Sequence, residues 1–318
     1  MKTTQKALVL GATGGVGGEV ARLLIQRGWQ VTGLTRNEQA LREQPDGINW
    51  VAGDAMNQQQ VIDAATGASL IVHAVNPPGY LDWEKLVLPM IDNTIAAAKQ
   101  AGARILLPGT VYNYGPDVFP DIDETSAQFP ISKKGKIRAE LERRLEKASH
   151  DGAPALIVRA GDFFGPRVAN SWFSQGLVAP GKPVSRIQYP GQPGIGHQWA
   201  YLPDVAETMV RLVENADKLG AFETFHMQGH WDADGTQIAA AIARAAGKPE
   251  MKASGFPWFV LRLLAPFKPT LKELFELRYL WKTPLRMHNA KLLKILGEEP
   301  HTPLDQAIRV TLQGLKCI

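Results

Sequence analysis

The chain has 318 residues, of which 45% are hydrophobic and 21% are charged, an ordinary composition for a globular protein with a sizeable core. Its 35 Lys and Arg nearly balance its 31 Asp and Glu, which argues against a nucleic-acid partner. The single cysteine, Cys317, excludes an intrachain disulfide and a cysteine metal cluster.

The N-terminal residues run directly into a predicted strand, without the apolar segment and cleavage site of a signal peptide. Apolar runs all fall well short of the ~20 residues that a membrane-spanning helix needs. We therefore expect a cytoplasmic protein with no membrane span and no metal site, whose partner is a small-molecule substrate.

Hydrophobic patterning and turn residues predict strands and helices along the whole chain. The expected strands are 6–10, 30–35, 48–52, 69–74, 104–108, 155–160 and 222–227. The expected helices are 15–27, 57–65, 83–100, one ending near Ser149, 236–246 and 271–281.

The turn between the first strand and the first helix is rich in glycine, with Gly11, Gly14 and Gly17 in the run KALVLGATGGVGG. Glycine is needed where the backbone takes positive φ, and where a phosphate approaches the main chain without meeting a Cβ. The helix N-terminus then offers free N–H groups to a pyrophosphate. Dinucleotide binding is favoured over a glycine-rich turn without a ligand, because strand, glycines and helix agree.

The Gly-x-x-Gly-x-x-Gly spacing, with GATG inside it, resembles the extended, epimerase/dehydratase-like branch of the short-chain dehydrogenase/reductase superfamily. The resemblance implies an α/β fold, a Rossmann-type doubly wound parallel sheet with a smaller, mainly helical C-terminal substrate lobe. It divides the chain into an NADP-binding domain, 1–160 and 197–228, and a substrate lobe, 161–196 and 229–318. Relatives often dimerise through long helices, which makes a homodimer an option.

The end of the second strand indicates which cofactor is bound. NAD enzymes place an Asp or Glu about 20 residues past the glycines, to bind the ribose 2′-OH. Arg36 stands there instead, and a guanidinium suits a 2′-phosphate. NADP(H) is therefore preferred over NAD(H); the alternative is a solvated surface arginine.

Further cofactor residues follow the third and fourth strands. Asp54 matches an Asp that contacts the adenine ring in the superfamily, and it is also a candidate cap for the next helix. The end of the fourth strand should pass beneath the cofactor, with His73 as a structural core residue. The predicted cofactor-binding residues are Gly11, Thr13, Gly14, Gly15, Val16, Gly17, Arg36, Asp54, Ala55, Ala74 and Lys136.

The fifth strand leads to a candidate substrate-binding hydroxyl. In the superfamily this strand end carries a Ser or Thr a few residues before a Tyr-Gly pair, which Thr110 and Tyr114-Gly115 match. The resemblance implies that Thr110 hydrogen-bonds the substrate. The alternative is a threonine bonded to backbone.

The catalytic motif of the superfamily is broken. Its proton donor is a Tyr four residues before a Lys, on the same helix face. Lys136 matches the lysine that holds the nicotinamide ribose, but Ser132 stands at the tyrosine position. An alcohol is a far weaker acid than a phenol, which titrates near ~10. A helix cap is the preferred role of Ser132.

Tyr112 is the first choice for a surrogate proton donor. Tyr112 and Tyr114 share strand parity with Thr110, so all three point the same way if the extended conformation continues. Packing of the Tyr112 ring in the wall is equally consistent with the sequence. His197 and Asp162 are weaker candidates.

Basic residues crowd the first turns of the helix after Ser132, whose N-terminus is already positive. They are Lys133, Lys134, Lys136 and Arg138. This placement is disfavoured unless something negative lies nearby, such as a cofactor phosphate or an anionic substrate. The alternative is that the side chains extend into solvent.

The second half of the chain continues the resemblance. Residues 159–167 resemble the segment at which the chain enters the substrate lobe, and Asp204 is expected to cap a helix. The apolar segment 256–267 is too short to span a membrane; it could lie on an interface, pack a dimer or cap the substrate lobe.

The resemblance implies an NADP(H)-dependent oxidoreductase acting on a small or medium carbonyl, alcohol or sugar-like substrate. The proton would come from water, the substrate or a surrogate such as Tyr112. The missing tyrosine instead favours a non-catalytic NADP(H) sensor or scaffold. A third reading is an epimerase or dehydratase that recycles its cofactor in place.

Overall fold

The structure is a computed structural model that describes the chain except residues 1–3, 44, 78–81, 169–170 and 265–274. The chain divides into two compact units. Unit 1 comprises Met1–Gly109, Ile137–Arg159 and Ala206–Phe225. Unit 2 comprises Thr110–Lys136, Ala160–Val205 and His226–Ile318.

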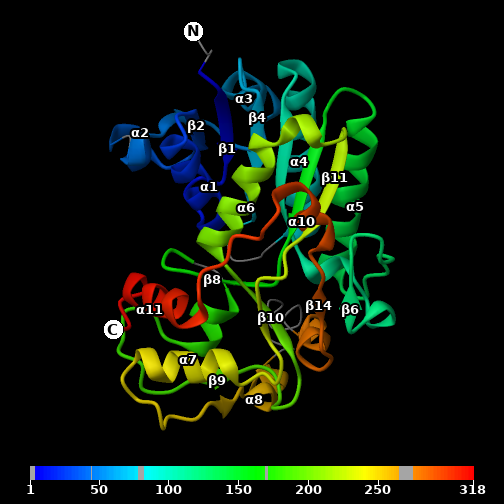
Figure 1. Cartoon of the computed structure of the whole chain (residues 1–318). Coiled ribbons are helices and arrows are strands. Elements are labelled where there is room, and N and C mark those ends of the chain that lie inside the picture. Colours follow the sequence, from blue (N-terminus) through cyan, green and yellow to red (C-terminus); the bar gives the residue numbers. More distant parts are fainter. Residues whose placement is uncertain (1–3, 44, 78–81, 169–170, 265–274) are drawn as a thin grey trace. The chain divides into compact units, whose positions relative to one another are not determined.

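Unit 1 is built on a seven-stranded sheet of order β11-β7-β5-β4-β1-β2-β3 (Figure 1). Neighbouring strands from β7 to β3 pair in parallel. The order reverses between β1 and β4, so the predicted doubly wound sheet is confirmed. The strands are β1 (Lys6–Leu10), β2 (Gln30–Thr35), β3 (Asn49–Ala52), β4 (Leu70–His73), β5 (Arg104–Gly109), β7 (Ala155–Arg159) and β11 (Phe222–His226).

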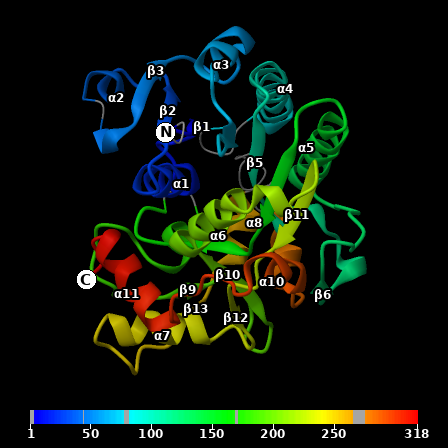
Figure 2. The same ribbon diagram turned by 45° about the horizontal axis from the view of Figure 1, so that its top comes forward.

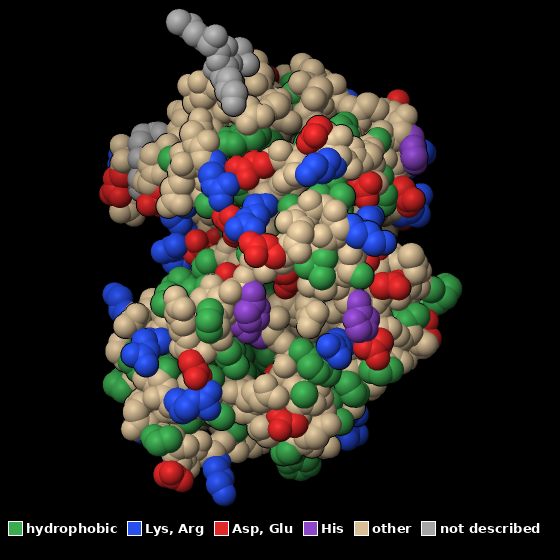
Figure 3. Space-filling view, in the orientation of Figure 1, with side chains coloured by type: hydrophobic (Ala, Val, Ile, Leu, Met, Phe, Trp, Pro, Cys, Tyr) green, Lys and Arg blue, Asp and Glu red, His purple; other side chains and the backbone are tan. Residues whose placement is uncertain are grey.

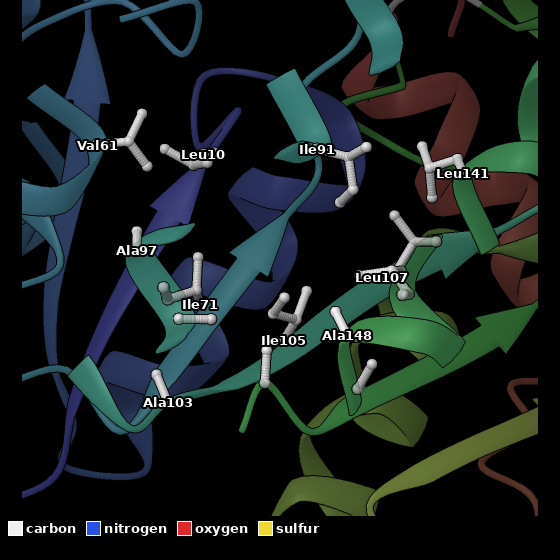
Figure 4. Packing of buried hydrophobic residues seen from close by; sticks show 14 of the residues in the cluster. Leu10, Val61, Ile71, Ile91, Ala97, Ala103, Ile105, Leu107, Leu141 and Ala148 are labelled. Carbon is white, nitrogen blue, oxygen red and sulfur yellow. The ribbon is translucent and has the colours of Figure 1, made fainter. Parts of the chain in front are cut away.

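Helices cover both faces of this sheet (Figure 2). On one face, α3, α4 and α5 pack on the strands through a core that includes Leu10, Ile71, Ile91 and Leu141 (Figure 4). On the other face lie α1 and α6, where Arg27 at the end of α1 forms ion pairs with Glu207 and Glu214 of α6. The helices are α1 (Gly15–Gln26), α2 (Glu38–Glu43), α3 (Gln58–Ala64), α4 (Trp83–Ala101), α5 (Lys133–Ser149) and α6 (Leu202–Glu214).

Unit 2 contains small sheets as well as helices. Its three-stranded sheet has the order β12-β10-β8, and two further sheets pair β13 with β9 and β14 with β6. The strands are β6 (Asp121–Ile122), β8 (Asp162–Phe164), β9 (Gln188–Tyr189), β10 (His197–Tyr201), β12 (His230–Asp232), β13 (Ser254–Gly255) and β14 (Arg286–Met287). The helices are α7 (Gln237–Ala245), α8 (Trp258–Leu264), α10 (Ala290–Leu296) and α11 (Leu304–Gly314).

Two sequence-based expectations for unit 2 need correction or restriction. The end of the helix predicted over 271–281 is a 3₁₀ turn, Arg278–Trp281, and residues 271–274 lie outside the described part. The segment 256–267 is described only to Leu264, where Trp258 donates its indole N–H to the Pro190 carbonyl. This contact ties the start of that segment to unit 2.

The described helices include none that is both long and apolar enough to cross a membrane. On the face seen in Figure 3, acidic and basic side chains are interspersed, in keeping with the small net charge of +4.

A buried ion pair joins α5 to the sheet. Arg159, the last residue of β7, places its guanidinium 2.5 Å from a carboxylate oxygen of Glu142, and their side chains are only 3% and 5% exposed. Removing one partner of such a pair leaves the other charge buried without compensation, which is much more costly than losing a surface pair.

Glu142→Gln should therefore lower the free energy of unfolding by about 3–5 kcal/mol. Glu140→Gln, on the same helix but in a more exposed pair with Arg143 and Arg144, is the matched control and should cost less than about 1 kcal/mol. Urea unfolding of both variants measures the difference. Equal losses would show that burial of the Glu142 pair does not matter.

Candidate functional site

The glycine turn after β1 is pressed against the end of β4. Gly11 has φ +88°, and a Cβ there would lie 2.5 Å from the Ala74 carbonyl oxygen. A Cβ at Gly17 would lie 2.3 Å from the Gly11 carbonyl oxygen. Side chains at these two positions would collide with backbone, so both must be glycine.

The outer side of the same turn is open. Gly14 is exposed and is the N-cap of α1, and a Cβ there would approach only the Gly11 carbonyl oxygen, at 3.2 Å. Thr13 is also exposed, and Gly15 and Val16 are half-buried. The first N–H groups of a helix have no partner within it. An open helix N-terminus at the point where strand order reverses fits a dinucleotide pyrophosphate.

Arg36 and Asp54 come together from the ends of β2 and β3. One guanidinium nitrogen of Arg36 lies 3.3 Å from an Asp54 carboxylate oxygen, and the Arg36 side chain is 68% exposed. The other Asp54 oxygen accepts a hydrogen bond from the Met56 N–H. The expected capping role of Asp54 is wrong, because Asn57 caps α3 by accepting from the Gln60 N–H.

The residues around Ala55 and Ala74 are fixed by neighbouring elements. Asn93 of α4 donates to the Ala55 carbonyl. His73 at the end of β4 is buried, and its Nδ1 lies 2.8 Å from the Thr94 hydroxyl. Burial and the nearby Arg138 charge lower the pKa of His73 to about 3. His73 is thus a neutral core residue, as its position in the strand predicts.

Thr110 begins a 3₁₀ turn, Val111–Asn113, at the start of unit 2. Its hydroxyl oxygen accepts the Tyr112 N–H at 3.3 Å, so a backbone hydrogen bond is present at this threonine. The extended conformation does not continue through Tyr114, so the condition under which Thr110, Tyr112 and Tyr114 would point the same way is not met. Tyr114 is fully buried, with its phenol 2.9 Å from His226 Nε2.

Ser132 caps α5. Its hydroxyl oxygen accepts the Gly135 N–H at 3.0 Å, which confirms the predicted cap. One turn later the Lys136 N–H donates to the Ser132 carbonyl, and the Lys136 side chain is exposed. A Cβ at Gly135 would lie 2.2 Å from the Tyr112 carbonyl oxygen. The Thr110 turn therefore packs directly on the start of α5.

Two side chains that sequence reasoning missed reach the start of α5 and the turn packed on it. Glu276 accepts the Lys133 N–H at 3.0 Å. The Tyr279 phenol donates to the carbonyl of Tyr114, which ends the turn that packs on this helix, at 2.9 Å. Neither contact has a local sequence signal, because 143 and 165 residues separate the partners.

Glu276 provides a negative group beside the basic cluster predicted at this helix. Another member of the cluster is also held within the protein: Arg138 donates to the Asn76 side chain at 2.8 Å and lies over the Trp83 ring. Side chains of the protein itself, Glu276 among them, therefore interact with part of the basic cluster for which the sequence showed no negative partner.

His197 and Asp162 form a hydrogen-bonded pair in unit 2, with Nε2 2.8 Å from a carboxylate oxygen. The imidazole stacks on Trp281 at a centroid distance of 3.8 Å. Asp204 is not a cap, since it lies inside the first turn of α6 and accepts from the N–H and hydroxyl of Thr302. Within the described residues there is no cluster of His, Cys, Asp and Glu suited to a metal ion.

Residues 11–161 match the model of a protein family described as NAD(P)H-binding. Together with the sheet order and the glycine turn, this match shows that the chain contains an NAD(P)-binding Rossmann domain. A comparison with curated protein sequences finds no match.

Solved structures share the fold over nearly the whole chain. MoeE5 in complex with UDP-glucose and NAD has a TM-score of 0.75 and 17% identity, covering 98% of each chain. UDP-glucose 4-epimerase from Bifidobacterium longum, in complex with NAD⁺ and UDP, has a TM-score of 0.74 and 16% identity, also covering 98% of each. WbmH from Bordetella bronchiseptica, in complex with NAD⁺, has a TM-score of 0.71 and 18% identity, covering 98% of this chain and 99% of its own.

Alanine substitutions at the packed Gly17 and at the exposed Gly14 should have different effects. Gly17→Ala should destabilise the fold by roughly 2 kcal/mol or more, because its Cβ would meet backbone at 2.3 Å. Gly14→Ala should keep its melting temperature within a few degrees but bind NADPH less tightly, because its Cβ would stand where a phosphate approaches. Thermal unfolding and NADPH fluorescence titration separate the two. Unchanged NADPH affinity in Gly14→Ala would place the pyrophosphate elsewhere.

The His73 environment predicts a pH effect on stability. Because its folded pKa of about 3 lies below the usual 6.5, the unfolded chain binds the proton first as pH falls. The folded state should lose stability from about pH 6.5 down to about pH 3. In His73→Asn this loss should be shallower by about 1 kcal/mol per pH unit. Urea unfolding between pH 4 and 7 gives both slopes, and identical slopes would contradict the assignment.

Proposed function

We propose that the protein is an NADP(H)-dependent oxidoreductase of the epimerase/dehydratase-like type, acting on a small or medium carbonyl, alcohol or sugar-like substrate. The observation that carries the proposal is the glycine turn at the strand-order reversal, inside the segment that matches the NAD(P)H-binding family. In this proposal unit 1 holds the cofactor and unit 2 supplies the substrate lobe.

Each half of the cofactor has proposed ligands. Gly14 and the first turn of α1 would bind the pyrophosphate, Arg36 the 2′-phosphate and Asp54 the adenine. Asp54 already accepts a hydrogen bond from Met56 and faces Arg36, so it also orients that guanidinium. Lys136, exposed on α5, would bind the nicotinamide ribose, as the superfamily resemblance implies.

The chemistry would require a hydride and a proton. When bound, NADPH would supply the hydride from C4 of its nicotinamide. Thr110 would hydrogen-bond the substrate oxygen with its hydroxyl proton, because its oxygen already accepts the Tyr112 N–H. Ser132 accepts the Gly135 N–H with its oxygen, so it too retains a proton to donate. Tyr112 is the first surrogate proton donor that the sequence offers, with His197 and Asp162 as weaker candidates.

A second candidate is a non-catalytic NADP(H) sensor or scaffold. It is favoured by Ser132, a helix cap at the position of the superfamily's proton donor. A third is an epimerase or dehydratase, supported by fold similarity to UDP-glucose 4-epimerase. NADPH consumption with a panel of aldehydes and ketones, and product analysis with UDP-sugars, discriminate the three. Tight NADPH binding with no reaction would favour the sensor.

Arg36→Ala should weaken NADPH binding about 10- to 100-fold, the equivalent of losing one charge-assisted hydrogen bond, and leave NADH binding nearly unchanged. Arg42→Ala, which removes a second exposed arginine from the end of α2, is the matched control and should change neither. Fluorescence titration with both cofactors measures the ratio. An unchanged NADPH:NADH ratio in Arg36→Ala would refute the 2′-phosphate assignment.

A further inference from the structure

A carboxylate of unit 1 stands beside the arginine that we assign to the 2′-phosphate. The sheet register pairs Thr35, the last residue of β2, with Ala52, the last residue of β3. One residue further on, the Gly53 N–H donates to the Thr35 carbonyl, so the two chain segments leave the sheet side by side. One guanidinium nitrogen of Arg36 consequently lies 3.3 Å from a carboxylate oxygen of Asp54.

The two partners of this contact differ in how firmly they are held. The Asp54 N–H donates to the Gln60 side-chain oxygen, and the Asp54 carbonyl accepts the Asn57 N–H, both at 2.9 Å. The second carboxylate oxygen of Asp54 accepts the Met56 N–H, also at 2.9 Å. The Arg36 side chain, by contrast, is 68% exposed. The negative charge therefore has a fixed position, and the guanidinium is the group that is able to reorient.

The contact is weak as an orienting hydrogen bond but close as a charge. Its 3.3 Å separation is longer than the about 2.7–2.9 Å typical of charge-assisted hydrogen bonds, and it runs through one guanidinium nitrogen. The Coulomb interaction falls only with the inverse of distance, so it loses little at this separation. Asp54 therefore acts on a ligand at Arg36 mainly through its negative charge.

We propose that Asp54 limits the preference for NADPH over NADH and leaves the protein able to bind either cofactor. This inference rests on the proposed function, in which Arg36 binds the 2′-phosphate. A phosphate monoester carries about −1.5 to −2 charges at pH 7, and a fixed carboxylate beside its binding group opposes that charge. The uncharged 2′-hydroxyl of NADH meets no such opposition. Asp54 is thus a specificity-determining residue of the cofactor site.

The position of this carboxylate supports the proposal. An acid at the end of the second strand is the feature that favours NAD in Rossmann enzymes. The sequence has Arg36 at that strand end, but the structure brings the Asp54 carboxylate to it from the end of β3. The opposite charges give this edge of unit 1 little net charge, which favours neither cofactor exclusively.

The proposal is tested by fluorescence titration with NADPH and NADH, without substrate or turnover. Asp54→Asn should raise the NADPH:NADH affinity ratio about 3- to 10-fold at low salt, because it removes the charge next to Arg36. The asparagine keeps an oxygen for the Met56 N–H. Contacts to the adenine are common to both cofactors and cancel in the ratio.

Salt and two control variants separate charge from other effects. The rise in Asp54→Asn should shrink at ~0.5 M NaCl, because salt screens exposed charges. Asp63→Asn, which removes another exposed carboxylate from α3, should leave the ratio within about twofold of wild type. Asp54→Glu, which retains the charge, should also stay near the wild-type ratio.

The outcomes that contradict the inference differ from those that contradict the proposed function. An unchanged or lowered ratio in Asp54→Asn, while Arg36→Ala loses NADPH affinity, would overturn the role of Asp54 alone. A lowered ratio would mean that orientation of Arg36 outweighs the charge. An unchanged ratio in Arg36→Ala would remove the 2′-phosphate assignment, and wild-type protein that binds neither cofactor would contradict the proposed function itself.

Discussion

The close approach of the Gly11 turn to the end of β4 is the constraint on which the candidate cofactor site of unit 1 depends. The backbone of the turn contacts the backbone at Ala74, and neither Gly11 nor Gly17 has room for a Cβ. That contact sets the direction in which α1 leaves the sheet, and with it the open N-terminus at Gly14. Strand order reverses between β1 and β4. The same contact therefore places this N-terminus at the edge of the sheet where open α/β folds bind their ligands.

The start of α5 has a comparable role in unit 2. Ser132 caps the helix, Gly135 lets the Tyr112 carbonyl approach, and Glu276 adds a contact from a distant segment.

Fold similarity and chemistry are separate questions in this protein. Structures at 16–18% identity cover almost the whole chain, which shows that its fold is shared with proteins solved in complex with NAD. The same similarity does not name a reaction, because activity resides in particular side chains.

The sequence by itself determined the sheet, the glycine turn, the Ser132 cap and the core role of His73, because these depend on local periodicity, on glycine geometry and on residues close in the chain. Tertiary structure alone decided the turn that breaks the parity of Tyr112, the pairing of Arg36 with Asp54, and the contacts of Glu276 with α5 and of Tyr279 with the Tyr114 carbonyl. The contacts join residues on separate elements, and the turn follows from packing at the end of a strand. No local sequence pattern predicts them.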